Sequence, residues 1–225
     1  MNNSDNLTGS VSDNGGFVPD KGFRRYSVVK RIIDIICSIL ALAVGAIPML
    51  IIAIIVKATS DGTVIFSQPR IGRYSKEFKC LKFRTMYKHA PSSCATASLH
   101  EADSLITPIG HILRKTSLDE LPQIINVLKG EMSFIGPRPL IPEEGDIHKA
   151  REKVGIYMLR PGISGYAQVH GRDFVSARQK VALDSYYLHH FSLGTDIRVF
   201  FDTIKGVLAA KDIHEGEVTD KTQSA

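Results

Sequence analysis

The sequence predicts a mainly α-helical protein with a small β element, an α+β fold that is attached to a membrane. A long uncharged run lies between residues 35 and 56, and basic residues flank it on both sides. Two short stretches with the pattern of β-strands follow, and most of the remaining chain has the spacing of helices. We therefore expect a re-entrant membrane helix-break-helix, followed by a cytoplasmic domain with amphipathic helices that lies on the membrane surface.

The first part of the chain is predicted to be a disordered polar tail over residues 1–24. Its beginning is rich in Asn, Asp, Ser and Gly and contains little that could be buried. No cleavable signal peptide fits, because the apolar run begins after residue 30 and no small-residue cleavage site closes it.

The membrane segment is predicted over residues 25–58. The run from Ile35 to Val56 has 22 residues without a formal charge, which is long enough to cross a bilayer as a helix. Pro48 lacks an amide hydrogen and favours a helix break near Gly45. Cytoplasmic flanks of membrane segments carry an excess of Lys and Arg, and here both flanks do. This favours a hairpin that returns to the same side, with a simple spanning helix as the alternative.

The domain that follows is predicted over residues 59–213. Thr63–Phe66 and Phe78–Phe83 have the pattern of short strands, and residues 86–105 that of a loop. The helix at 196–210 has a broad apolar stripe that either packs in the core or lies in the lipid headgroup layer. A flexible tail is expected over residues 214–225. Helices are predicted at 106–115, 118–129, 143–153, 174–190 and 196–210.

The composition favours an anionic partner and gives no sign of a thiol or histidine metal site. The net charge is +5, which suits nucleic acid, acidic lipids or phosphorylated substrates. Three cysteines contain no CxxC pair, and an odd number fits a reducing compartment. The eight histidines show no HExxH spacing.

Two adjacent carboxylates, Asp119 and Glu120, lie in the segment Ser117–Gln123, where a helix is expected to begin. Ser117 followed by Glu120 matches a capping box, so the pair could be purely structural. A helix N-terminus would also favour the ionised form of Asp119. An ionised, partly desolvated aspartate can attack phosphorus, and Glu120 could hold magnesium beside a diphosphate.

Three further segments supply cations. Arg138 stands between Pro137 and Pro139; Pro139 favours an extended backbone at Arg138, which would suit two hydrogen bonds to a phosphate. The segment Arg160–Arg172 combines three glycines, two arginines and a glutamine, a composition that suits either a loop that approaches a ligand closely or a hairpin connection. It has no Walker or GxGxxG pattern. The segment Lys82–Met86 adds two cations that, taken alone, describe a solvated basic strand.

Taken together, these segments resemble a family, the bacterial sugar transferases known as monotopic polyprenyl-phosphate phosphoglycosyl transferases, and in particular its short-form members. The resemblance covers about residues 30–213 in several ordered motifs. The motifs that carry it are Lys30–Asp34, Phe66–Gly72, Lys82–Met86, Ser117–Gln123, Asn126–Ser133, Gly136–Leu140, Arg160–Arg172 and Leu183–Tyr187.

The resemblance implies transfer of a sugar 1-phosphate from a nucleotide sugar, usually a UDP-sugar, to undecaprenyl phosphate, which gives undecaprenyl-diphospho-sugar and UMP. It implies that Asp119 is the nucleophile of a covalent aspartyl-phosphosugar intermediate, that Glu120 is associated with Mg²⁺, and that Arg138 with Pro139 binds substrate. Weaker transfers assign substrate-binding roles to five further residues. These are Lys82, Arg84, Arg114, Gln168 and Asp184.

The resemblance also implies a re-entrant membrane segment, contact with membrane lipids and a place at the cytoplasmic face of the bacterial inner membrane, where such enzymes initiate surface glycan synthesis. Three positions depart from the family's pattern. Pro48 has no serine before it, Tyr166 stands where Trp is usual, and His170 stands where Asn is common. The last two leave the sugar preference open.

Two other classes of protein compete with an enzyme. A non-catalytic membrane-surface adaptor would need neither the Asp119–Glu120 pair nor the Pro-Arg-Pro loop. A nucleic-acid binder conflicts with the apolar run and has no recognisable motif, so no nucleic acid is expected as a partner. The sequence leaves homo-oligomerisation open.

Overall fold

The computed structural model describes residues 8–11, 16–90, 104–171 and 176–208. The predicted C-terminal tail, residues 1–7 of the predicted N-terminal tail, much of the predicted loop at 86–105 and Arg172 lie outside these residues. The strands are β1 (Gly9–Val11), β2 (Phe17–Pro19), β3 (Ile65–Ile71), β4 (Glu77–Phe83), β5 (Ser133–Ile135) and β6 (Gly162–Ser164). The helices are α1 (Lys21–Thr59), α3 (Pro108–Lys115), α4 (Gln123–Lys129), α5 (Gly145–Lys153), α6 (Tyr166–Gly171), α7 (Ala177–His189) and α8 (Leu193–Leu208), with 3₁₀ turns η1 (Arg73–Ser75), η2 (Leu118–Glu120) and η3 (Ile156–Met158).

The described residues are mostly helical with small sheets, as the sequence predicts. Within them, three sheets of two strands each occur: β1–β2 and β3–β4 are antiparallel, and β5–β6 is parallel. The β3–β4 hairpin contains the two predicted strands, although β3 begins at Ile65 and runs further than expected. Its register places Lys82 opposite Phe66.

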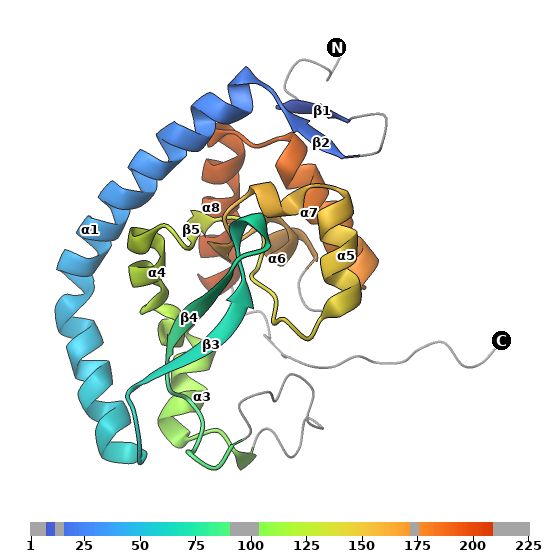
Figure 1. The fold of residues 1–225 in the computed structure, drawn as a ribbon. Helices are drawn as coiled ribbons and strands as arrows, with labels where there is room; N and C mark the ends of the chain where they lie inside the picture. Colours follow the sequence, from blue (N-terminus) through green and yellow to red (C-terminus); the bar gives the residue numbers. More distant parts are fainter. Residues whose placement is uncertain (1–7, 12–15, 91–103, 172–175, 209–225) are drawn as a thin grey trace.

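Helix α1 is the longest element, with 39 residues, and it contains Pro48 without an interruption. Asp20 caps its start by accepting a hydrogen bond from the Phe23 amide at 2.7 Å. The predicted helix break is therefore absent: α1 is a continuous arc, and the rest of the fold lies on its concave side (Figure 1). A proline removes one backbone hydrogen bond, and in an apolar helix the neighbouring turns tolerate this loss as curvature.

The convex side of α1 is an exposed apolar surface. Of the described part of the chain, α1 is the one helix that is long and apolar enough to cross a membrane. Only 6% of its most apolar 18-residue window is buried. The exposed large apolar side chains of this helix are Val28, Val29, Ile32, Ile36, Ile39, Leu40, Val44, Ile47, Leu50, Ile51, Ile54 and Ile55.

Both ends of α1 are fastened to the same folded domain. Near the start, Arg31 donates hydrogen bonds to the carbonyls of Val127 and Leu128, at 2.6 and 2.8 Å. Near the end, Val56 is buried in a cluster with Phe83 and Leu113. The helix therefore lies along the domain over most of its length.

The N-terminal segment differs from the predicted disordered tail. Residues 9–11 and 17–19 form the β1–β2 hairpin, and Thr8 donates its amide to the carbonyl of His189 at 2.9 Å. The reason is Phe17, whose side chain is buried beside Phe23 and Leu188. This aromatic contact with the core is a tertiary feature that composition alone does not reveal.

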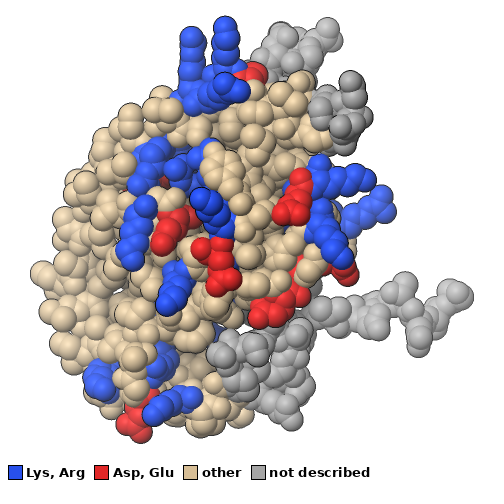
Figure 2. All heavy atoms as spheres, viewed as in Figure 1, with Lys and Arg blue, Asp and Glu red and all other residues tan. Residues whose placement is uncertain are grey.

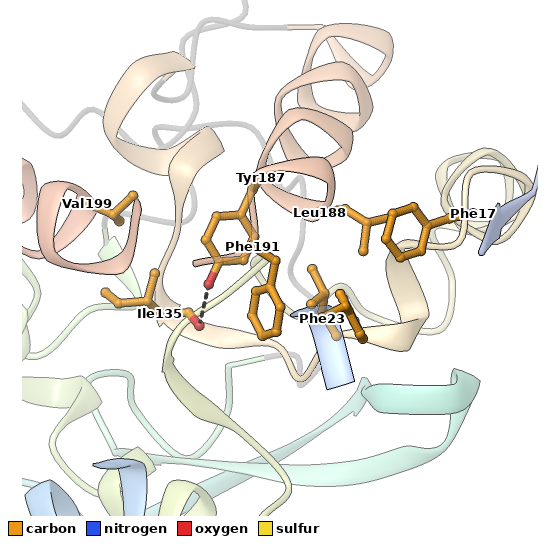
Figure 3. Close-up of a cluster of buried hydrophobic side chains, with 8 residues drawn as sticks. Phe17, Phe23, Ile135, Tyr187, Leu188, Phe191 and Val199 are labelled. Carbon is orange, nitrogen blue, oxygen red and sulfur yellow. Dashed lines mark hydrogen bonds between the residues drawn. The ribbon is translucent and has the colours of Figure 1, made fainter. Parts of the chain in front are cut away.

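The main core joins α1 to α7, α8 and β5. Figure 3 shows Tyr187, Leu188 and Phe191 packed against Phe17 and Phe23, with Val199 and Ile135 on the other side. Tyr187 donates its hydroxyl to Asp196 at 2.6 Å and to the Ile135 carbonyl at 3.3 Å. Its polar tip is therefore satisfied inside the core.

Four of the five predicted helices correspond to α3, α5, α7 and α8, with ends shifted by up to three residues. The fifth, at 118–129, is divided into η2 and α4. In α8, core packing covers only part of the apolar surface. Val199 is fully buried in the core, whereas Ile197, Phe200, Phe201 and Ile204 are exposed.

Candidate functional site

The site is centred on η2, where Asp119 and Glu120 face the β3–β4 hairpin. Lys82 of β4 places its Nζ atom 2.7 Å from Glu120 Oε1 and 4.0 Å from Asp119 Oδ2. Asp119 is 7% exposed. Two carboxylates and a lysine from distant parts of the sequence are thus brought into one partly desolvated cluster.

The predicted capping box at Ser117 is not formed. Ser117 has a left-handed backbone with φ 57°, and its side chain makes no capping hydrogen bond. The α-helix begins only at Gln123, after Pro122. The reason lies in the tertiary structure: Glu120 is bonded to Lys82 instead of folding back to the Ser117 amide. A tight 3₁₀ turn therefore presents the carboxylates, and the helix-dipole argument for Asp119 loses its geometric basis.

Glu120 is held in its ionised form by two cations. Burial alone would raise the pKa of its carboxyl, but the nearby charges of Lys82 and Arg138 outweigh burial, and the pKa lies below its usual value. Hydrogen bonds from Lys82 and Gln123 act in the same direction. At neutral pH this side chain is a fixed negative charge.

The loop that carries Arg138 and Pro139 is held from two sides. Arg70 donates to the Pro139 carbonyl at 3.1 Å, and the Ile71 amide donates to the Leu140 carbonyl at 2.9 Å. On the other side, Arg151 donates to the Arg138 carbonyl at 2.8 Å. The prolines and these bonds fix the backbone from which the Arg138 guanidinium projects, and its charge reaches Glu120.

Arg70 of β3 is a site residue that the sequence analysis missed. Burial lowers the pKa of its guanidinium, and the neighbouring charge of Arg138 lowers it further. Gln68 accepts a hydrogen bond from Arg70 at 2.7 Å. Among the described residues no carboxylate lies within ion-pair distance of Arg70. In the sequence, the spacing of Gln68 and Arg70, which places both on one face of a strand, is the signal that could have identified Arg70.

Asp184 lies behind the Arg138 loop. Its carboxylate is 2.6 Å from Arg151, and the two side chains are 1% and 4% exposed. Because Arg151 also holds the Arg138 carbonyl, Asp184 can influence the site through Arg151. Such a buried pair gives it the geometry of a positioning residue.

Two other predicted residues are bonded elsewhere. Arg84 donates to the Asp61 carbonyl at 2.7 Å and to the Thr63 hydroxyl at 2.5 Å, so it stabilises the turn that follows α1. Arg114 of α3 donates to the Thr85 hydroxyl at 2.9 Å. Arg114 lies on the helix that packs against η2, while Arg84 shows no described contact with the carboxylate pair.

The glycines of the Arg160–Arg172 segment serve backbone packing. A Cβ atom at Gly162 would lie 2.1 Å from the amide nitrogen of Gly136, and one at Gly165 would lie 2.2 Å from its carbonyl oxygen. Gln168 donates to the Ile163 carbonyl at 3.3 Å. The segment up to Gly171 forms β6, which pairs in parallel with β5, and then α6, so it is not the hairpin connection that was one of the two expectations.

The donor set is sparse for a metal held by protein alone. No group of three His, Cys, Asp or Glu side chains with metal-binding geometry occurs within residues 8–11, 16–90, 104–171 and 176–208. Mg²⁺ commonly uses one or two carboxylates and completes its shell with water and substrate phosphates. The ionised Glu120 beside Asp119 fits a magnesium ion that takes its other ligands from water and substrate phosphates.

The chain matches the bacterial sugar transferase family over residues 25–210. It is 40% identical over 196 residues to an uncharacterized sugar transferase of Haemophilus influenzae, covering 80% of this chain and 41% of the relative. It is 38% identical over 190 residues to the UDP-N-acetylgalactosamine-undecaprenyl-phosphate N-acetylgalactosaminephosphotransferase of Aeromonas hydrophila, covering 81% and 44%.

These two relatives are much longer, and the chain spans about two fifths of their length. The exopolysaccharide production protein ExoY of Sinorhizobium fredii is similar in length; it is 35% identical over 198 residues, which cover 82% of this chain and 87% of the relative. Both the family match and this coverage include the carboxylate pair, Lys82 and the Arg138 loop. The chain belongs to the bacterial sugar transferase family.

Proposed function

We propose that this protein transfers a sugar 1-phosphate from a UDP-sugar to undecaprenyl phosphate, which releases UMP and initiates surface glycan or glycoconjugate synthesis. The observation that carries the proposal is the cluster of Asp119 and Glu120 with Lys82, beside Arg70 and with the charge of Arg138 acting on Glu120. The name of the Aeromonas hydrophila relative, a UDP-N-acetylgalactosamine-undecaprenyl-phosphate N-acetylgalactosaminephosphotransferase, supports the same classes of donor and acceptor.

In the proposed first step, the Asp119 carboxylate attacks the phosphorus that bears the sugar. A new carboxyl oxygen–phosphorus bond forms, the bond to the bridging oxygen breaks, and its electron pair leaves with UMP. In the second step a phosphate oxygen of undecaprenyl phosphate attacks the same phosphorus. The aspartate is released unchanged, and the product is undecaprenyl-diphospho-sugar.

The cations of the site suit an anionic donor. Lys82 is close enough to both carboxylates to move between them and a bound phosphate. Arg138 and Arg70 offer planar, bidentate donors, which bind phosphate with defined orientation. Pro139 restrains Arg138, and the Asp184–Arg151 pair holds its backbone from behind.

Magnesium is part of the proposal, with Glu120 as its protein ligand. When bound, the ion would neutralise charge on the donor diphosphate. Glu120 is suited to this role because Lys82 and Arg138 keep its pKa low. Lys82 would then exchange part of its contact with Glu120 for phosphate oxygens.

We further propose that α1 enters the cytoplasmic face of the bacterial inner membrane and returns to it. A spanning helix would place its ends on opposite sides of a layer about 30 Å thick. Here Arg31 near one end and Val56 near the other contact the same domain. The exposed apolar surface of α1 is therefore best covered by the membrane lipids of one leaflet, with the helix curved through Pro48.

The test is an assay of UMP release from protein in nanodiscs, with undecaprenyl phosphate, Mg²⁺ and a panel of UDP-sugars. One sugar should give UMP that depends on the lipid. Asp119→Asn should abolish it while the protein stays folded in the membrane, because an amide is not a nucleophile for this step. Asp146→Asn is a matched control, since that carboxylate is fully exposed on α5.

The covalent step has its own readout. Wild-type protein given donor without acceptor should gain the mass of one sugar phosphate, and Asp119→Asn should not. Substantial turnover in Asp119→Asn would refute the nucleophile. A folded wild type that is silent with every donor, beside a working control enzyme, would favour the non-catalytic adaptor.

A further inference from the structure

A second basic site lies at the far end of α4 from the carboxylate pair. Arg31 of α1 caps the Val127 and Leu128 carbonyls, and the Nε atom of Arg160 donates to the Gly130 carbonyl at 2.9 Å. Unpaired carbonyls at a helix C-terminus attract cations, which accounts for Arg31 and for one edge of Arg160. This attraction does not account for the terminal amino groups of the Arg160 guanidinium.

Arg73 approaches the same place from the β3–β4 turn. Its Nε atom donates to the Met158 carbonyl at 2.8 Å. Arg73 and Arg160 line one small cavity, of about 20 Å³, together with Ser133 and Asp34. Within the described residues, no hydrogen bond or ion pair occupies the terminal amino groups of Arg73 or Arg160.

The local charge is unbalanced. Asp34 lines the cavity and offsets part of the positive charge of Arg160, and its Oδ1 atom accepts hydrogen bonds from the Ser133 hydroxyl and the Phe134 amide. Lys30, on the same cavity, is paired with Asp196 at 2.5 Å. Burial lowers the pKa of Arg160, and the charges of Arg73 and Arg31 lower it further. Half-buried like charges of this kind are stabilised by an added anion.

The position of Arg31, Arg73 and Arg160 indicates which anion is available to bind them. Arg31 lies one turn before the uncharged run that begins at Ile35. Its neighbours Ile32 and Ile36 are 54% and 52% exposed on the membrane side of α1. Figure 2 shows basic side chains gathered beside the upper half of α1, next to the β3–β4 turn of Figure 1. If α1 contacts lipid tails there, the cluster lies near headgroup depth.

We propose that Arg73 and Arg160, backed by Arg31, bind the phosphate of an anionic phospholipid headgroup. The inference rests on the membrane attachment proposed above. The site is separate from the carboxylate pair, because α4, seven residues or about 10 Å long, stands between them. A lipid held there would anchor the start of α1 and the β3–β4 hairpin to the bilayer surface together.

The experiment compares Arg73→Gln/Arg160→Gln with Lys76→Gln/Lys129→Gln. Both remove two positive charges, and the control lysines are exposed neighbours with no described side-chain partner. Each protein is taken from nanodiscs of mixed phosphatidylglycerol and phosphatidylcholine, and retained lipid is counted by native mass spectrometry. Wild type and control should retain phosphatidylglycerol preferentially. The arginine variant should lose that preference by roughly tenfold, as expected for lost charge-assisted hydrogen bonds.

Three outcomes would overturn the proposal. An equal loss in the lysine control would mean diffuse surface attraction. Unchanged retention in the arginine variant would place the lipid elsewhere. Stabilisation of detergent-held wild type by inorganic phosphate, without retained phosphatidylglycerol, would mean a site for free phosphate.

A folding defect can be separated from lost binding. Arg73→Gln alone gives up one described hydrogen bond, to Met158, and a contact with the Tyr74 ring, and should still reduce retention while far-ultraviolet circular dichroism and Tm stay native. Lipid retention is measured without any sugar donor. Failure of this proposal and failure of the transferase proposal are therefore distinguishable.

Discussion

The buried pair of Arg151 and Asp184 should be among the most sensitive points of the structure. The two side chains are 4% and 1% exposed and lie 2.6 Å apart. Arg151→Met removes the cation and leaves the carboxylate in the interior without its partner. Breaking a buried pair from one side costs about 3–5 kcal/mol. Against a typical free energy of unfolding of about 5–15 kcal/mol, that is a large fraction.

The loss should depend on pH in a definite direction. Burial already raises the pKa of Asp184 despite Arg151, and removing Arg151 raises it further. The folded state then holds a proton more firmly than the unfolded state. Stability therefore falls as pH rises from the ordinary aspartate value, about 4, through the raised folded value. Arg151→Met should be least destabilised in acid and most destabilised at neutral pH.

Thermal unfolding in one detergent, at mildly acidic and at neutral pH, checks this. A cost of 3–5 kcal/mol corresponds to a Tm lower by roughly 6–20 °C for a domain of this size. The double variant Arg151→Met/Asp184→Leu removes both charges and should recover most of the loss. Its UMP release should nevertheless stay low, because the Arg138 carbonyl has lost its donor.

Each of these expectations has an outcome that would contradict it. A neutral-pH Tm of Arg151→Met equal to wild type would show that the interior tolerates a lone Asp184 carboxylate. A double variant no more stable than the single one would locate the cost in lost packing. Full activity in the stable double variant would show that Arg151 does not position Arg138.

Three further changes have expected outcomes. Ser117→Gly should raise the free energy of unfolding by about 1 kcal/mol, measured by denaturant titration, because Ser117 has φ 57°, its side chain makes no capping hydrogen bond and glycine adopts that conformation freely. Lys82→Met should raise the pKa of Glu120 and move the acid limb of the pH–rate profile to higher pH. Gly136→Ala should strongly destabilise the domain in the same titration, because the new Cβ would lie 2.3 Å from the Arg160 carbonyl.

These three can fail independently. An unchanged denaturation midpoint in Ser117→Gly would mean that the backbone at Ser117 is not strained. An acid limb that stays in place in Lys82→Met would mean that Glu120 does not control it. Gly145→Ala is the control for Gly136→Ala, since a Cβ there meets nothing within 4 Å, and an equal effect of the two would remove the packing argument.

The carboxylate pair and Lys82 could be predicted as candidates from their residue types and family motifs, and the structure brings them together. The local geometry could not be predicted. Ser117 and Glu120 have the spacing of a capping box, but a partner 38 residues away binds Glu120 more favourably. Local rules fail at this point because the competing contact is remote in sequence.

The same limit explains the other differences. Arg84 and Asp184 look like site cations and anions in the sequence, yet their partners, Asp61 and Arg151, decide what they do. Gly162 suggested a ligand loop, but its neighbour is the backbone of Gly136. In contrast, the helix predicted at 174–190 is present as α7, where local capping bonds at Ser176 fix its start.

The ion pair between α1 and α8 has a consequence for the order of events during synthesis of the protein. Lys30 pairs with Asp196, which leaves the ribosome 166 residues later. At ordinary translation rates that delay is on the order of ten seconds. During it Lys30 has no Asp196 to pair with, and part of the domain that α1 lies against has yet to be made. The membrane attachment proposed above would therefore have α1 meet the bilayer before its contacts with the C-terminal part of the domain can form.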